Sequence, residues 1–80
     1  MHYVYIVNSI DAPEHFYTGY TTNIEQRLQD HNTGKSVHTK QYRPWKLITY
    51  IAFNSKDTAL NFEKYLKSGS GRAFSTRHFK

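Results

Sequence analysis

Three apolar runs, separated by polar and turn-forming segments, predict three β-strands. Residues 2–9 form an unbroken run of β-branched and aromatic side chains, which indicates a buried strand. Alternation along this strand places Tyr3 and Tyr5 on one face and Val4 and Ile6 on the other. Both faces of the strand therefore have large side chains to bury.

The second and third strands follow turn and loop signals. Residues 11–13 (Asp-Ala-Pro) predict a turn, because proline fixes its own φ and aspartate hydrogen-bonds nearby backbone. A strand at His15 to Tyr20 comes next, so the first two strands should form a hairpin. Trp45 to Phe53 is nearly continuous in apolar and β-branched residues, and we expect it to be the central strand.

A first helix is predicted between the second and third strands. Thr22 and Glu25 have the three-residue spacing of a capping box, so the helix should begin at Asn23. It should end close to Gly34, because glycine readily adopts the left-handed conformation that closes helices. Residues 35–43 are polar, basic and without periodicity, which indicates a loop.

A second helix is predicted after the third strand. Ser55 is a suitable N-cap, and Asp57 lies where a carboxylate interacts favourably with the helix dipole. This helix should continue to about Ser68 and stop at Gly69. The tail that follows can add a short helix that packs Phe74 on the core.

Composition excludes several classes of protein. Eighty residues suffice for one small domain, residues 1–80, and for no second one. The absence of cysteine excludes a disulfide framework, a thiol nucleophile and a zinc–cysteine site. No apolar run reaches the roughly 18 residues needed to span a bilayer, and the amino terminus lacks the pattern of a secretion signal. We therefore expect a soluble, cytoplasmic protein that does not associate with membranes.

Positive charge is concentrated away from the amino terminus. The formal net charge is +5, and all 11 lysines and arginines follow residue 25. From Lys64 to the last residue there is no acidic side chain. This bias favours a polyanionic partner such as DNA or RNA, and a merely solvated basic surface is the alternative.

Charged and polar residues at core-facing helix positions indicate a functional site. Arg27 and His31 share one face of the first helix with Ile24 and Leu28. Glu63 lies inside the apolar arc of the second helix, where a carboxylate is unfavourable unless a cation, a metal or hydrogen bonds meet it. Two interpretations stay open: Arg27 binds phosphate, or an internal pair joins Glu63 to Arg27 or to a lysine, beside a hydrogen-bonded histidine.

Two strand tyrosines belong with this group. In the predicted hairpin Tyr17 can approach Tyr5, which places two phenols near Arg27. Paired strand tyrosines are usually core residues. A phenol has a pKa of roughly 10, so it acts as a base at neutral pH only if cations or a metal-bound water favour its deprotonation.

In their order and spacing, these residues resemble the GIY-YIG nuclease superfamily, and in particular its small stand-alone branch related to the amino-terminal nuclease domain of excinuclease. The resemblance extends from Tyr3 to about Lys67. It is carried by the segments Val4-Tyr5-Ile6, Tyr17-Thr18-Gly19, Arg27, His31-Asn32-Thr33-Gly34-Lys35, Arg43-Pro44 and Glu63. Two residues depart from the motifs: Tyr3 stands where the first has glycine, and Thr18 stands where the second has isoleucine.

The resemblance implies an α+β fold, with a three-stranded antiparallel sheet flanked by helices. It also implies hydrolysis of a DNA phosphodiester with one divalent ion, Mg²⁺ or Mn²⁺. Glu63 matches the metal ligand, Arg27 the phosphate-binding arginine, Tyr17 the proposed general base, and Tyr5 the tyrosine that supports it. His31 matches a position that hydrogen-bonds the nucleophilic water or its base; with a pKa near 6.5 it is the other candidate base.

Flanking phosphates should meet six basic residues: Lys35, Lys40, Arg43, Lys64, Lys67 and Arg72. Such contacts position a substrate without reading its sequence. Because 80 residues leave no spare domain for base readout, we expect recognition of DNA structure, or a partner protein that supplies targeting, in DNA repair or processing. The alternatives are a non-catalytic nucleic-acid-binding module on the same scaffold and a protein-interaction domain with an internal Arg27–Glu63 ion pair.

Overall fold

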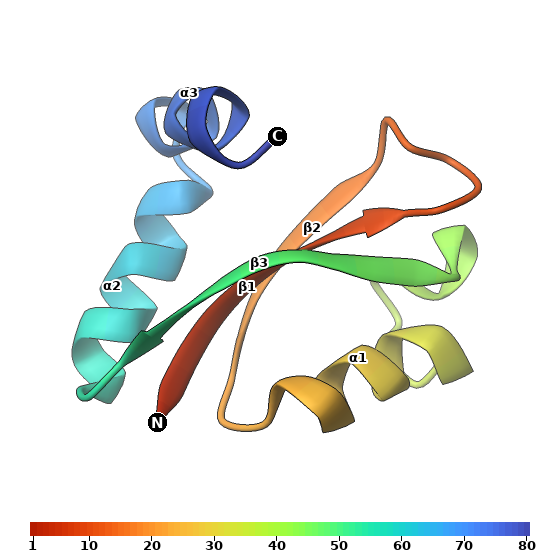
Figure 1. The fold of residues 1–80 in the computed structure, drawn as a ribbon, viewed down its shortest axis with the longest axis horizontal. Coiled ribbons are helices and arrows are strands. Elements are labelled where there is room, and N and C mark those ends of the chain that lie inside the picture. Colours follow the sequence, from red (N-terminus) through yellow and green to blue (C-terminus); the bar gives the residue numbers. More distant parts are fainter.

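A three-stranded antiparallel sheet forms the middle layer of the protein in the computed structural model, which describes residues 1–80 (Figure 1). Its strands are β1 (His2–Ser9), β2 (Phe16–Thr21) and β3 (Trp45–Phe53). β1 pairs antiparallel with both of the others, so the strand order is β2-β1-β3. The predicted sheet and hairpin are confirmed.

The prediction that the third strand is central is wrong, because β1 occupies the middle of the sheet. All six residues from Val4 to Ser9 on β1 are buried, whereas Lys46, Tyr50 and Ala52 on β3 are exposed. An apolar run shows that the faces of a strand are covered. It does not show that both edges are paired.

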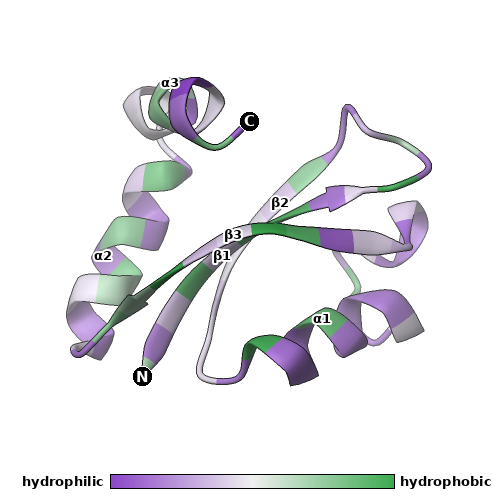
Figure 2. Cartoon of the chain, viewed as in Figure 1, coloured by the Kyte–Doolittle hydropathy of each residue, from purple (hydrophilic) through white to green (hydrophobic).

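Helices cover the two faces of the sheet unequally. α1 (Ile24–Thr33) lies on one face, and α2 (Lys56–Leu66) and α3 (Gly69–His78) lie on the other (Figure 1). None of them has the length and apolar character that crossing a membrane requires. In Figure 2 the helices alternate between hydrophobic and hydrophilic segments, as expected for helices with one face on a sheet.

The alternation predicted for the first strand divides the core into two clusters. Val4 and Ile6 pack with Ala59 and Leu66 on the side of α2 and α3. Tyr5, Val7 and Trp45 form the second cluster, on the side of α1. The predicted contact of Phe74 with the core is confirmed in the first cluster.

The start of α1 differs by one residue from the prediction. Asn23, and not Thr22, is the N-cap: its side-chain oxygen accepts a hydrogen bond from the Gln26 backbone N–H at 3.1 Å. Asparagine is at least as good an N-cap as threonine, so the helix begins at Ile24. Its end is as predicted, with Gly34 in the left-handed conformation at φ 85°.

The junction of α2 and α3 also differs from the prediction. α2 ends at Leu66, and Gly69 begins α3 instead of ending α2. Ser68 causes this, since its hydroxyl donates to the Tyr65 carbonyl at 2.6 Å and accepts from the Gly71 N–H at 3.2 Å. One serine thus satisfies the end of one helix and the start of the next.

The loop predicted at residues 35–43 contains a short 3₁₀ helix, η1 (Lys40–Tyr42). Ser36 and Thr39 within this loop are buried, although its composition is polar. The loop therefore packs against the domain beside α1.

Candidate active site

Tyr5 is the point at which the strand and the first helix meet. Its side chain is only 2 % exposed. Its hydroxyl is hydrogen-bonded to Nε2 of His31 at 2.7 Å and accepts a hydrogen bond from Nε of Arg27 at 3.3 Å. Because α1 places Arg27 and His31 four residues apart, both side chains reach the same phenol oxygen.

Gly19 makes room for this phenol. It lies opposite Tyr5 in the β1–β2 pairing. A Cβ atom at Gly19 would lie 2.4 Å from the Tyr5 hydroxyl oxygen and 2.6 Å from Cζ. The glycine of the Tyr17-Thr18-Gly19 segment is therefore needed for close packing against the ring.

His31 continues the hydrogen-bonded chain into the loop that follows α1. Its side chain is fully buried, and its Nδ1 is hydrogen-bonded to the Thr39 hydroxyl at 2.6 Å. The Thr39 carbonyl in turn accepts a hydrogen bond from the Trp45 indole at 2.8 Å. Asn32 holds the same tryptophan, since its side chain bonds both the N–H and the carbonyl of the Trp45 backbone. The position of His31 is thus set from both ring nitrogens.

Burial controls the protonation of the tyrosine and the histidine. It raises the pKa of Tyr5 to about 12, although the hydrogen bond from Arg27 opposes this shift. Burial, with the Arg27 charge, lowers the pKa of His31 to about 4. The value near 6.5 expected for His31 is therefore wrong, and at neutral pH the imidazole is neutral and the phenol of Tyr5 is protonated.

Tyr17 and Glu63 complete the candidate site. The Tyr17 ring lies half-buried on β2, with its centroid 6.5 Å from that of Tyr5 and 5.2 Å from that of His31. Glu63 comes from α2 and forms an ion pair with Lys67 at 3.0 Å. Lys67 Nζ also lies 5.8 Å from the centroid of the Tyr17 ring, so this lysine links the carboxylate to the tyrosine.

One of the two internal ion pairs that the sequence left open is absent. Arg27 pairs with Asp30 at 3.8 Å and forms no ion pair with Glu63. Glu63 is paired with a lysine, Lys67, which was the other possibility. The interpretation as an interaction domain with an Arg27–Glu63 pair therefore loses its basis.

The donor groups at Glu63 suit a hard divalent cation that the protein shares with a substrate. The Glu63 side chain is 20 % exposed. No group of three or more His, Cys, Asp or Glu side chains could enclose a metal ion. Mg²⁺ is commonly held by one or two carboxylates, with substrate phosphate and water as its other ligands, so a single carboxylate fits such an ion.

A cationic cavity of about 350 Å³ adjoins Tyr17, between β2 and the α2–α3 pair. Lys67, Arg72 and Lys80 line it, and burial together with the Arg72 charge lowers the pKa of Lys80. Ser75 lines the same cavity, and its buried hydroxyl has no hydrogen-bond partner. Three cations and a free hydroxyl are the groups that a phosphate requires.

Comparison with known proteins places the whole chain in one family. The family model described as the GIY-YIG catalytic domain matches residues 1–77. The chain belongs to the GIY-YIG family. The resemblance stated from the motifs is thereby confirmed.

Relatives of this GIY-YIG domain are found in bacteria, archaea and yeast. It is 46 % identical to a UPF0213 protein of Staphylococcus haemolyticus over 70 residues, which are 86 % of this chain and 83 % of that protein. It is 41 % identical to a UPF0213 protein of Haloquadratum walsbyi over 68 residues, 84 % of this chain and 74 % of that protein. It is 38 % identical to the structure-specific endonuclease subunit SLX1 of Debaryomyces hansenii over 84 aligned positions, which cover 96 % of this chain but 23 % of that protein.

A solved structure supports the fold. The UPF0213 protein BH0048 from Bacillus halodurans is similar with a TM-score of 0.56 and 36 % sequence identity, over 95 % of this chain and 80 % of that one. The α+β fold with a three-stranded antiparallel sheet is therefore that of the GIY-YIG domain.

The basic residues predicted to bind nucleic acid fall into separate places on this GIY-YIG domain. Lys40 and Arg43 lie together beside Gly34, where Arg43 donates to the Lys40 carbonyl at 3.5 Å. Lys35 and Lys64 are exposed, on the loop and on α2. Lys67 and Arg72 line the cationic cavity described above. Their contacts with nucleic acid stay a prediction.

Several residues of the site were not identified from the sequence. They are Gly19 as a packing residue, Asn32, Thr39, Ser75 and Lys80. Thr39 lies in a polar loop with no periodicity, so nothing marks it as buried. The Glu63–Lys67 pair had a signal, because the two residues are four apart on a helix.

Proposed function

We propose that this GIY-YIG domain is a divalent-metal-dependent endonuclease that hydrolyses DNA phosphodiester bonds according to DNA structure rather than sequence, in DNA repair or processing. The observation that carries the proposal is the convergence of Arg27 and His31 on the Tyr5 hydroxyl, with Tyr17 alongside. The yeast relative is named a structure-specific endonuclease subunit. By analogy, a partner protein supplies targeting for this domain.

Arg27 binds the phosphate in this proposal. Its Nε is held by the Tyr5 hydroxyl and its Nη1 lies near Asp30, which fixes the orientation of the guanidinium. The side chain is still 34 % exposed, so N–H groups remain for a ligand. A preoriented cation that meets the charge developing on phosphate oxygens is often worth about 3 kcal/mol in the transition state.

Tyr17 takes the proton from the attacking water. Tyr5 is excluded as the base, because its pKa is about 12 and its buried hydroxyl is already hydrogen-bonded. His31 is excluded because it is fully buried and both ring nitrogens have partners. Tyr17 is half-buried, and its hydroxyl makes no hydrogen bond within the protein. Tyr5 and His31 are therefore positioning residues, and a correctly placed base contributes roughly 10²–10⁴-fold to the rate.

Glu63 would hold a single Mg²⁺ or Mn²⁺ ion, which would supply charge neutralisation on the phosphate and the leaving oxygen. Lys67 pairs with the same carboxylate and therefore competes with a cation for it. The cationic cavity beside Tyr17 would bind a neighbouring phosphate through Lys67, Arg72 and Lys80.

The test is cleavage of branched, flapped and single-stranded DNA in the presence of Mg²⁺ or Mn²⁺. The parent should cut at least one of these substrates, and Glu63→Gln should reduce the rate by about 10²-fold or more. Glu14→Gln is the matched control, because Glu14 is an exposed carboxylate in the β1–β2 connection, and it should cut like the parent. If no DNA is cut, or if Glu63→Gln cuts as fast as the parent, the enzymatic proposal is wrong.

The second candidate function is a non-catalytic nucleic-acid-binding module. The observation in its favour is the Glu63–Lys67 ion pair, which leaves the carboxylate already neutralised. Such a module would bind DNA with a strong salt dependence, and neither a chelator nor Glu63→Gln would weaken the binding. The same set of variants thus separates the two functions.

A further inference from the structure

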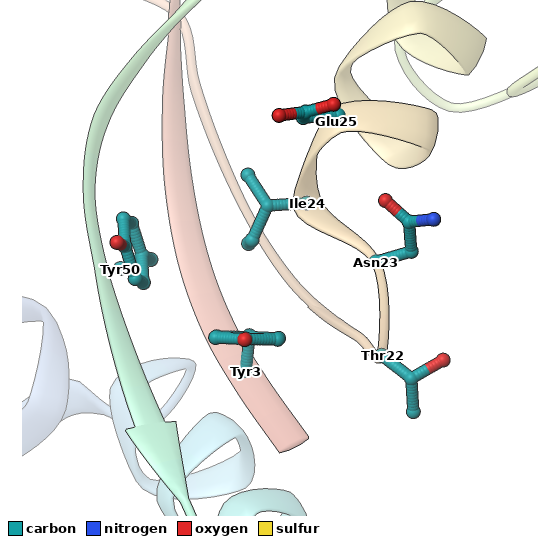
Figure 3. A pocket seen from close by; sticks show the side chains of 6 residues that line it. All are labelled: Tyr3, Thr22, Asn23, Ile24, Glu25 and Tyr50. Atoms are coloured by element: carbon teal, nitrogen blue, oxygen red, sulfur yellow. The ribbon is translucent and has the colours of Figure 1, made fainter. Parts of the chain in front are cut away.

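A second cavity, of about 370 Å³, opens on the α1 side of the sheet and has no part in the proposed chemistry. Its walls come from Tyr3 on β1, Tyr50 on β3 and the start of α1. Figure 3 shows the side chains of Tyr3, Tyr50 and Ile24 around one open space, with Glu25 extending over it. We call this space the Tyr3–Tyr50 cavity.

Exposed aromatic surface is the main feature of the Tyr3–Tyr50 cavity. The two rings meet edge to face, with centroids 5.6 Å apart and planes at 75°. Tyr50 is 51 % exposed although it lies on a sheet strand. Neither hydroxyl has a hydrogen-bond partner in the protein. Flat apolar faces with free polar tips are suited to a flat aromatic ligand that also carries polar edges.

The charge of the cavity separates it from the phosphate sites. No lysine, arginine or histidine lines it, and its one ionised group is the Glu25 carboxylate, which forms no ion pair. A phosphate is therefore not a suitable ligand. A carboxylate accepts hydrogen bonds from the exocyclic amino group of cytosine, adenine or guanine, whereas thymine has no such group.

The cavity is adjacent to the candidate active site. Tyr50 is the direct cross-strand partner of Tyr5, and Tyr3 precedes Tyr5 by two residues on the same face, about 7 Å along β1. Ile24 lies one helical turn before Arg27, about 4.5 Å along the axis of α1. Nucleotides of a stacked strand rise roughly 3.4 Å each, so a base in the cavity is one or two nucleotides from a phosphate on Arg27.

A departure from the family motif builds one wall of this cavity. The first GIY-YIG motif has glycine where this chain has Tyr3. A glycine there would remove the ring that stands against Tyr50. The cavity is therefore a property of this chain that the shared catalytic residues do not require.

We propose that the Tyr3–Tyr50 cavity binds one unpaired nucleobase of the substrate strand, stacked on the tyrosine rings with its amino group on Glu25, next to the phosphate on Arg27. The inference rests on the proposed function and adds the source of its preference for DNA structure. A base within a continuous duplex must first be unstacked and unpaired, whereas a base in a flap or branch is already free.

The test measures binding without cleavage, in EDTA, by fluorescence anisotropy of labelled single strands. The probes are oligodeoxycytidine, oligothymidine and a backbone of the same length that carries only abasic residues. Parent protein should bind oligodeoxycytidine about tenfold more tightly than the abasic strand, the gain typical of one stacked base. Tyr50→Leu should reduce this ratio about tenfold, and Tyr65→Leu, which changes a comparably exposed tyrosine on α2, should leave it unchanged.

Glu25→Gln separates stacking from recognition of the amino group. It should keep the preference for bases over the abasic strand and lower the preference for oligodeoxycytidine over oligothymidine by about fivefold or more. The proposal is overturned if all strands bind but Tyr50→Leu and Tyr65→Leu change the base-to-abasic ratio equally. If the parent binds none of the strands, the proposed function itself fails and the inference fails with it.

Discussion

Replacing Gly19 with alanine tests whether the Tyr5 ring is fixed in its place. The added Cβ would lie 2.4 Å from the Tyr5 hydroxyl oxygen, and an ordinary contact begins at 3.4 Å, so the hydroxyl must move by about 1 Å. The ring is buried, and its hydroxyl bonds both His31 and Arg27. Overpacking of this kind costs about 1–3 kcal/mol, and disturbing the hydrogen bonds adds about 1 kcal/mol. Gly→Ala also restricts the unfolded chain by up to about 1 kcal/mol, so we expect a net loss of about 2 kcal/mol.

The assay is urea denaturation followed by the fluorescence of Trp45, which is buried in the native state. Gly69→Ala is the matched control, because a Cβ at Gly69 meets nothing within 4 Å and the change in the unfolded chain is the same. Its stability should equal or slightly exceed that of the parent. DNA cleavage by Gly19→Ala should fall as well, since Tyr5 orients Arg27.

A Gly19→Ala variant as stable as Gly69→Ala would refute this reasoning, because it would show that the ring moves freely. A double-mutant cycle with Tyr5→Phe checks the cause. The phenylalanine removes the atom nearest to the added methyl group, so Gly19→Ala should be less destabilising in that background by about 1 kcal/mol. Equal costs in both backgrounds would place the strain elsewhere.

Three further predictions follow from the geometry. As pH falls from 6.5 to about 4, the unfolded chain protonates His31 and the folded one does not, so the parent should lose about 3 kcal/mol of stability; His31→Gln should flatten this slope in urea titrations, and exposed His38→Gln should not. Gly71→Ala places a Cβ 1.7 Å from the Tyr65 carbonyl oxygen and should destabilise the domain by more than about 3 kcal/mol, seen as a lower melting temperature. Lys67→Met frees the Glu63 carboxylate and should tighten Mn²⁺ binding about two- to fivefold by calorimetry; unchanged affinity would show that Lys67 does not compete with the cation.

Local pattern predicted most of the fold. The bounds of β1 and β3 agree with their apolar runs, and the end of α1 agrees with Gly34. The order of the strands was wrong, because hydropathy reports which faces are covered and does not report which edges pair. The junction at Ser68 was also missed, since one hydroxyl serves two helices there and the sequence shows only a serine near a glycine.

The candidate site was predicted as far as helical periodicity reaches. The spacing of Arg27 and His31 on α1 indicated that both face inward, and the structure brings both to Tyr5. Thr39 was not predicted, because its contact with His31 depends on how a loop without periodicity folds back. The lowered pKa of His31 follows from that enclosure, so it too required the structure.

The position of β1 in the sheet has a consequence for biosynthesis. The strand that is made first is the middle one, and its second edge pairs with β3, so that His2 waits for Phe53. A growing chain that has not yet reached the end of β3 cannot complete the sheet on which Tyr5 is placed, and Glu63 emerges later still. Long-range pairing of this kind folds late and cooperatively. An unfinished chain therefore carries all the tyrosines of β1 and β2 and no assembled catalytic site.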